Sequence, residues 1–214
     1  EFYLKNPNSN LKPRIFYFSL EMRKESKILS VIAYKLFKDF RISKSPEELL
    51  SVFRNKVVDD ELYKLIQGYD NFFKEFEERV TFIDHIRNPF GIFKYMEDYA
   101  LSAGHWEYKN MQWEEDGKIT SKKVRDFYVP DDPKELVIII VDHASLLLPE
   151  KQQTLHEAMS KFSSDYCLYL RDKYKYNITV IQQQAAAQEQ KQFSGLSGEN
   201  IIEKLKPTAD GLGD

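Results

Sequence analysis

Cysteine and long apolar runs are scarce in this sequence of 214 residues. The single cysteine, Cys167, cannot form an internal disulfide, which favours a reducing compartment. The four histidines show no zinc-ligand spacing with it, so we expect no structural zinc. The longest apolar run, residues 136–141, is far too short to cross a bilayer, and no charged-then-apolar leader opens the sequence. We therefore expect a cytoplasmic protein with no membrane partner.

Charge of one sign is not in excess either, because 31 basic and 34 acidic residues leave a net charge of −3. Proteins that coat nucleic acid through bulk electrostatics are usually more basic than this. If the protein binds DNA, we expect a local patch, assembled from several subunits, to make the contact. With 42% hydrophobic and 30% charged residues, the composition is that of a soluble globular protein with room for one sizeable α/β domain.

Apolar, β-prone runs and helical stretches alternate along the chain. Continuous rather than alternating apolar character predicts strands that are covered on both faces, as in a parallel sheet. The four runs are residues 15–18, 80–83, 136–141 and 178–181. Helices are predicted between them over residues 24–40, from Ser45-Pro46 onwards, over 59–78 with a break at Gly68, over 93–103 and over 151–174. This alternation predicts an α/β fold with a mostly parallel sheet flanked by helices.

One stretch, residues 105–133, breaks the alternation. A Glu-Asp-Gly turn at 115–117 lies between two alternating segments and predicts a β-hairpin insertion ahead of the third apolar run. Two groups in it have ordinary structural interpretations: Trp106 and Trp113 are expected to pack the hairpin, and Lys122, Lys123 and Arg125 to form a solvated basic edge.

Acids and an amide follow the predicted strands, where an open parallel sheet binds its ligands. These residues are Glu21, Asp84, Asp142 and Gln183. Such a set suits a nucleotide, because one acid can polarise a water, another can hold Mg²⁺ through its water shell, and the amide can sense the terminal phosphate. An acid at this position is more often a helix cap or a solvated turn residue. No G-x-x-x-x-G-K-[ST] loop occurs in the sequence, so the pattern alone indicates no more than a candidate nucleotide site.

The order of these motifs resembles that of the DnaB-type replicative DNA helicases. Ile15-Phe-Tyr-Phe-Ser-Leu-Glu-Met22 is similar to the strand and "FSLEM" signature of that family. Val137-Ile-Ile-Ile-Val-Asp142 resembles its Walker B strand, although His143 stands where Tyr is usual and Ser145 where Gln is usual. Ile178-Thr-Val-Ile-Gln-Gln183 is similar to its "V-I-x-L-S-Q" motif. The resemblance covers nearly all of the chain apart from the insertion.

This resemblance implies a RecA-like ATPase domain, present in part over residues 1–214, that uses ATP and Mg²⁺. It implies Glu21 as the catalytic base, Asp142 as the residue that binds Mg²⁺ through water beside the nucleotide, and Gln183 as the phosphate sensor in catalysis and nucleotide binding. The next residues would form a central-channel loop that grips single-stranded DNA, with Gln184, Gln188, Gln190, Lys191, Gly195 and Gly198 as its contacts.

The family also works as a ring, which here implies a hexamer, with primase and a helicase loader as further partners. The phosphate-binding loop is expected before residue 1 and the arginine finger after the last residue, so the 214 residues alone are predicted to be inactive. The insertion and the altered Walker B neighbours suggest a phage-type member. Two alternatives stay open: a non-catalytic RecA-like module that associates with a helicase or its loader, and a RecA-like recombinase or circadian-clock-type ATPase.

Overall fold

A parallel four-stranded sheet forms the centre of the computed structural model, which describes residues 10–50, 58–115 and 118–182. The strand order is β2-β1-β5-β6, and each neighbouring pair is parallel. The strands are β1 (Lys12–Ser19), β2 (Val80–Ile83), β5 (Glu135–Asp142) and β6 (Asn177–Ile181). The four predicted apolar runs therefore all become strands of one sheet.

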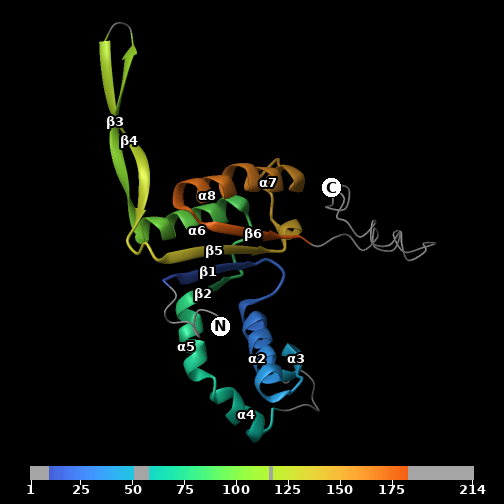
Figure 1. The fold of residues 1–214 in the computed structure, drawn as a ribbon. Helices are drawn as coiled ribbons and strands as arrows, with labels where there is room; N and C mark the ends of the chain where they lie inside the picture. The colour runs from blue at the N-terminus through green and yellow to red at the C-terminus, as the bar shows by residue number, and fades with distance from the viewer. Residues whose placement is uncertain (1–9, 51–57, 116–117, 183–214) are drawn as a thin grey trace, which may run out of the picture.

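Helices flank this sheet on both sides (Figure 1), although Val180 and Ile181 of β6 stay 40% and 39% exposed. One face carries α6 (Pro89–Ser102), α7 (Leu155–Lys161) and α8 (Leu168–Tyr174). The other carries α2 (Lys24–Phe40) and α5 (Asp70–Arg79), with the short α3 (Pro46–Leu49) and α4 (Asp60–Gln67) beyond them. The predicted class, an α/β domain with a mostly parallel sheet flanked by helices, is confirmed.

The main core lies between the sheet and α6 and α8. Alternate residues of β1 and β5 face it, among them Phe16, Phe18 and Ile139, all fully buried or nearly so. On α6, Ile92 and Met96 meet them with no exposed surface. A smaller cluster of Leu36, Leu62 and Tyr69 joins α2 to α4 and α5. Because these contacts cross between segments far apart in sequence, they hold the carboxyl ends of the strands in fixed register.

Local signals place most helix ends where the sequence predicts them. Ser45 accepts a hydrogen bond from the Glu48 amide and Glu48 binds back to the Ser45 amide, a capping box that starts α3. Gly68 ends α4, as expected. The prediction of one helix over 151–174 was wrong in two ways. The helix begins only at Leu155, because Thr154 and Glu157 form a second capping box. A π-helical turn, η2 (Phe162–Cys167), also separates α7 from α8.

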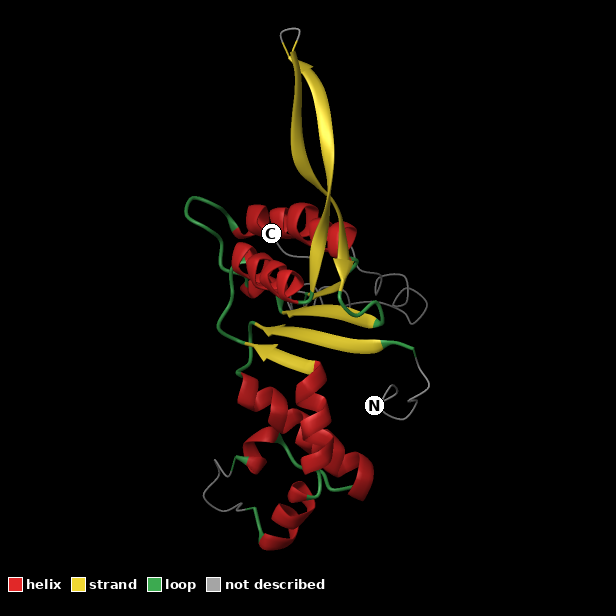
Figure 2. Cartoon of the chain, turned by 90° about the vertical axis from the view of Figure 1, so that its left-hand side faces the viewer, coloured by secondary structure: helices red, strands yellow, loops and turns green. Residues whose placement is uncertain are grey.

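The predicted hairpin is present as β3 (Gly104–Glu115) and β4 (Lys118–Pro130), joined in a second, antiparallel sheet. It rises away from the domain on the side of α6 and α8 (Figures 1 and 2). At its base Gly104 lies against the Val129 carbonyl and the Tyr128 ring so closely that a Cβ would collide with both. The hairpin thus starts at a position that only glycine fits.

No helix among the described residues is both long and apolar enough to cross a membrane.

Candidate functional site

The carboxyl ends of β1 and β5 meet at one edge of the sheet. Ser19, the last residue of β1, is in register with Asp142, the last residue of β5. The Leu20 amide donates to the Asp142 carbonyl at 2.6 Å, and the Ser19 hydroxyl donates to the Met22 carbonyl at 2.6 Å. These bonds hold the turn that carries Glu21 beside the end of β5. Three of the four predicted strand-end residues, Asp84, Glu21 and Asp142, therefore follow the adjacent strands β2, β1 and β5.

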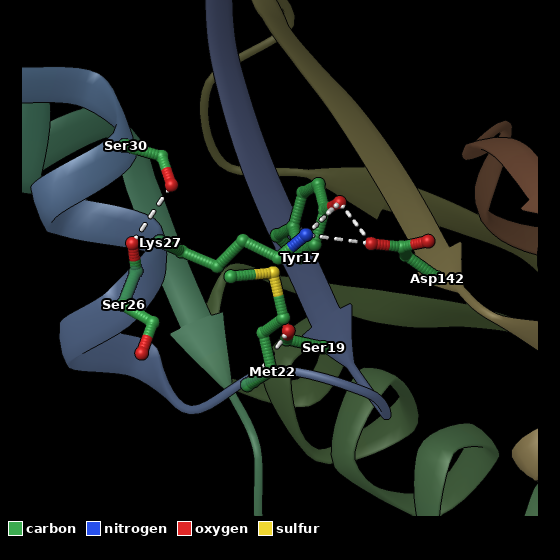
Figure 3. Close-up of polar contacts among 7 residues, drawn as sticks. All are labelled: Tyr17, Ser19, Met22, Ser26, Lys27, Ser30 and Asp142. Atoms are coloured by element: carbon green, nitrogen blue, oxygen red, sulfur yellow. Dashed lines mark hydrogen bonds and ion pairs between the residues drawn. The ribbon is translucent and has the colours of Figure 1, made fainter. Parts of the chain in front are cut away.

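Asp142 is the centre of a cluster that the sequence did not predict (Figure 3). The hydroxyl of Tyr17, two residues before the end of β1, donates to Asp142 Oδ2 at 2.6 Å. Lys27, in the first turns of α2, donates to the same oxygen at 2.7 Å and to the Tyr17 hydroxyl at 3.1 Å. The Lys27 ammonium also lies 5.0 Å from the centre of the Tyr17 ring. Both side chains of the ion pair are mostly buried, with 17% of Lys27 and 13% of Asp142 exposed.

The electrostatics of the cluster favour its ionised form. Burial alone would raise the pKa of Asp142, but the hydrogen bonds from Lys27 and Tyr17 outweigh it, so that pKa is lowered. Burial alone would lower the pKa of Lys27, but its bonds to Asp142 and Tyr17 outweigh it and the pKa is raised. Burial, then the bond to Asp142, raises the pKa of Tyr17. At neutral pH the cluster is therefore a carboxylate, an ammonium and a neutral phenol.

Replacing Lys27 with Met removes the ammonium and leaves the Asp142 carboxylate only partly compensated, so we expect the free energy of unfolding to fall by about 1–3 kcal/mol at pH 7. Because folding lowers the Asp142 pKa, its stabilisation is complete above the unfolded pKa of about 3.9 and is lost as the pH falls through the lower folded value. Urea unfolding of both proteins should show their difference shrinking below about pH 4.

Lys24→Met is the matched control, because Lys24 is exposed and lies one turn earlier on α2. It should leave the free energy of unfolding unchanged at pH 7 and at pH 3. A Lys27→Met effect of the same size at pH 7 and pH 3 would contradict the ion pair with Asp142.

The other predicted site residues have different surroundings. Glu21 is exposed, and no hydrogen bond or ion pair holds its carboxylate among the described residues. Asp84 follows β2, and its carboxylate accepts a hydrogen bond from the backbone amide of Lys24 at 2.8 Å. Asp84 therefore caps the start of α2 from the end of β2. His143 contacts the Ser145 hydroxyl at 3.0 Å through Nδ1. Gln183 and the predicted DNA contacts lie outside the described residues: Gln184, Gln188, Gln190, Lys191, Gly195 and Gly198.

As arranged, Asp142 does not fit a Mg²⁺ site by itself. Lys27 already supplies a positive charge to Oδ2, and the described part of the chain contains no group of three or more His, Cys, Asp or Glu residues that could hold a metal ion. Tyr17 and Lys27 are the residues that sequence reasoning missed. A usable signal existed for Tyr17, because it lies two residues before Ser19 and so shares the face of the sheet on which Asp142 lies.

Neither a protein-family model nor a curated protein matches the chain. Solved structures do match it, and the likeness is one of fold, to the kind of helicase and ATPase domain that the resemblance implied. One is a DnaB-like replicative helicase, described with its interactions with primase: the TM-score is 0.52 and the identity 15%, over 89% of this chain and 37% of that one. The other is described as an ATPase domain, with a TM-score of 0.53 and 15% identity over 89% of this chain and 54% of that one. The chain thus spans about a third to a half of the proteins it matches.

Proposed function

We propose that this chain is the greater part of the ATPase domain of a DnaB-type replicative helicase. The observation that carries the proposal is the position of Glu21 and Asp142 at the carboxyl ends of the two central strands, β1 and β5, in a fold shared with helicase ATPase domains. In an open parallel sheet this edge is where a nucleotide binds. Glu21 would serve as the general base toward the attacking water, its exposure leaving it open to solvent and ligand.

The remaining parts of the proposal extend to the full-length protein. ATP binding needs a phosphate-binding loop that residues 1–214 do not contain. For Asp142 to hold Mg²⁺ through water, either its Oδ1 accepts the water or Lys27 releases Oδ2, the oxygen that it contacts. Gln183 would sense the terminal phosphate, and residues 184–198 would line the channel of a hexameric ring on single-stranded DNA. Primase and a loader are the partners proposed for that ring.

The test is DNA-stimulated ATP hydrolysis and unwinding of a forked duplex by the full-length protein, with the gene read about 40 codons upstream of residue 1, the length of a phosphate loop and its helix. We expect a G-x-x-x-x-G-K-[ST] motif there, hydrolysis that rises with single-stranded DNA, and unwinding that requires ATP.

One observation favours a second candidate, a non-catalytic RecA-like module that associates with a helicase or its loader. Lys27 neutralises Asp142 where a nucleotide-dependent enzyme needs a carboxylate free for the metal. A gene with no phosphate-binding loop, together with a full-length protein that neither hydrolyses ATP nor unwinds DNA, would overturn the first function, and co-purification with a replicative helicase or its loader would then support the second.

A further inference from the structure

The β3–β4 hairpin extends far beyond the surface that the rest of the domain provides (Figure 2). Its base is anchored: Trp106 and Tyr128 pack edge-on against Tyr174 of α8. Further out both faces are open, and Met111, Trp113 and Ile119 are 55%, 38% and 79% exposed. Two-stranded ribbons are marginally stable alone, and Met111 and Trp113, two residues apart in β3, share one open face of this one. The hairpin therefore has the form of a binding arm.

Its middle part, residues 108–111 with 122–125, is basic, although residues 104–130 together carry five acidic and five basic residues. This basic ribbon segment contains four cations, Lys109, Lys122, Lys123 and Arg125, and no acid. Lys109 is paired with Asp126 at 2.7 Å, at the inner end of the segment. Lys122 and Lys123 are exposed and have no carboxylate within ion-pair distance among the described side chains. Two uncompensated cations therefore stand on adjacent residues far from the sheet.

The cations lie on both faces of the ribbon, each next to an aromatic or apolar side chain. On one face the paired residues Tyr108 and Arg125 lie beside Lys123, whose ammonium is 5.0 Å from the Tyr108 ring centre. On the other face Met111 is paired with Lys122, and Trp113 follows two residues further out. Cations interleaved with aromatic rings are the chemistry that binds the phosphates and the base faces of an unpaired nucleic-acid strand.

We propose that the basic ribbon segment binds single-stranded nucleic acid. A single strand is favoured over a duplex because its bases are free to stack on Tyr108 or Trp113, whereas those of a duplex are stacked on one another. A second copy of the ribbon is disfavoured because Lys122 and Lys123 would meet the same charges on its partner.

The proposed nucleic-acid contact on the hairpin is separate from the sheet edge at which a nucleotide would bind, the edge where β1 and β5 end. The hairpin leads into β5 at Glu135, whereas Asp142 ends that strand, so the two lie at opposite edges of the sheet, roughly 23 Å apart along β5 at about 3.3 Å per residue. It is also distinct from residues 184–198, the proposed channel contacts. The inference therefore holds or fails independently of ATP hydrolysis.

The decisive variant is Lys122→Ala/Lys123→Ala in the 214-residue chain, with Lys64→Ala/Lys74→Ala on α4 and α5 as a control of equal charge change and similar exposure. The probe is fluorescein-labelled dT20, followed by anisotropy from 50 to 300 mM NaCl without nucleotide. We expect the ribbon variant to bind roughly tenfold more weakly at about 100 mM salt, with the slope of log K against log salt smaller by about 1.4, or 0.7 for each lost phosphate contact. The control should match the unmodified chain.

A second measurement follows Trp113, whose emission should be quenched by dT20 and whose replacement in Trp113→Phe should remove that quenching. Unchanged affinity and salt slope in Lys122→Ala/Lys123→Ala would overturn the proposal. Tighter binding of a 20-base-pair duplex than of dT20 would also overturn it. So would self-association of the unmodified chain in sedimentation velocity, if Lys122→Ala/Lys123→Ala abolished that self-association and left dT20 binding unchanged. ATP hydrolysis by the full-length protein should persist in the ribbon variant, so a failure here is distinct from a failure of the helicase proposal.

Discussion

Glu21→Gln in the full-length protein is expected to slow ATP hydrolysis by about 10²–10⁴-fold while ATP binding persists. The substitution keeps the size of the side chain and removes its ability to accept a proton. Because Glu21 is exposed and no contact among the described residues restrains it, little stability should be lost with the charge. Steady-state phosphate release and binding of a fluorescent ATP analogue measure the two effects separately.

Glu25→Gln is the matched control for this experiment. Glu25 is also exposed and lies four residues further along, in the first turn of α2, so the control makes the same charge change close to the same edge of the sheet. It should hydrolyse ATP at the unmodified rate. Hydrolysis by Glu21→Gln at the rate of the control would remove Glu21 from the role of general base and leave the nucleotide edge without an acid suited to that role, because Asp84 caps α2 and Asp142 is paired with Lys27.

The sheet could be predicted from sequence because its signals are local. A strand covered on both faces has to be continuously apolar, and β5 shows this over residues 136–141, where one face is buried and the other half-buried. The helix predicted over 24–40 has the observed bounds, since Ile28, Ile32 and Leu36 repeat at helical spacing and Arg41 leaves the helix in a left-handed conformation. The hairpin follows from alternation on both sides of a turn. In each case the information lies within one continuous stretch of sequence, the longest being the hairpin from Gly104 to Pro130.

The chemistry at the sheet edge could be predicted only in part. The strand-end positions of Glu21 and Asp142 follow from the pattern, but the partner of Asp142 does not, since Lys27 is 115 residues away. That pairing exists because β1 and β5 are neighbours and α2 returns over the same edge, which is a property of the strand order. Asp84 shows the same limit. An acid after a strand can face a ligand or the start of a helix, and here the first amide of α2 lies within hydrogen-bond distance of its carboxylate.

Trp106 and Trp113 belong to the same strand, β3, yet we expect Trp106→Ala to lower the free energy of unfolding by about 3–5 kcal/mol and Trp113→Ala by less than about 1 kcal/mol. Trp106 is 7% exposed and belongs to the main core, where its ring lies 5.6 Å from that of Tyr174 and 6.0 Å from that of Tyr128. The Arg125 guanidinium lies 5.2 Å above the same ring. Removing the indole leaves a cavity where the hairpin meets α8.

Urea denaturation of the two variants and the unmodified chain measures the difference, and equal slopes against urea would show that the extent of unfolding is unchanged. Both variants remove one tryptophan from the same strand, β3. A difference between them therefore reports where the tryptophan packs and not the loss of a tryptophan as such. If the two variants lose equal stability, the ribbon packs along its whole length and its outer faces are not a free binding surface. If Trp106→Ala alone is costly, the domain holds the base of the arm rigidly and presents the basic ribbon segment to solvent, the arrangement that strand binding requires.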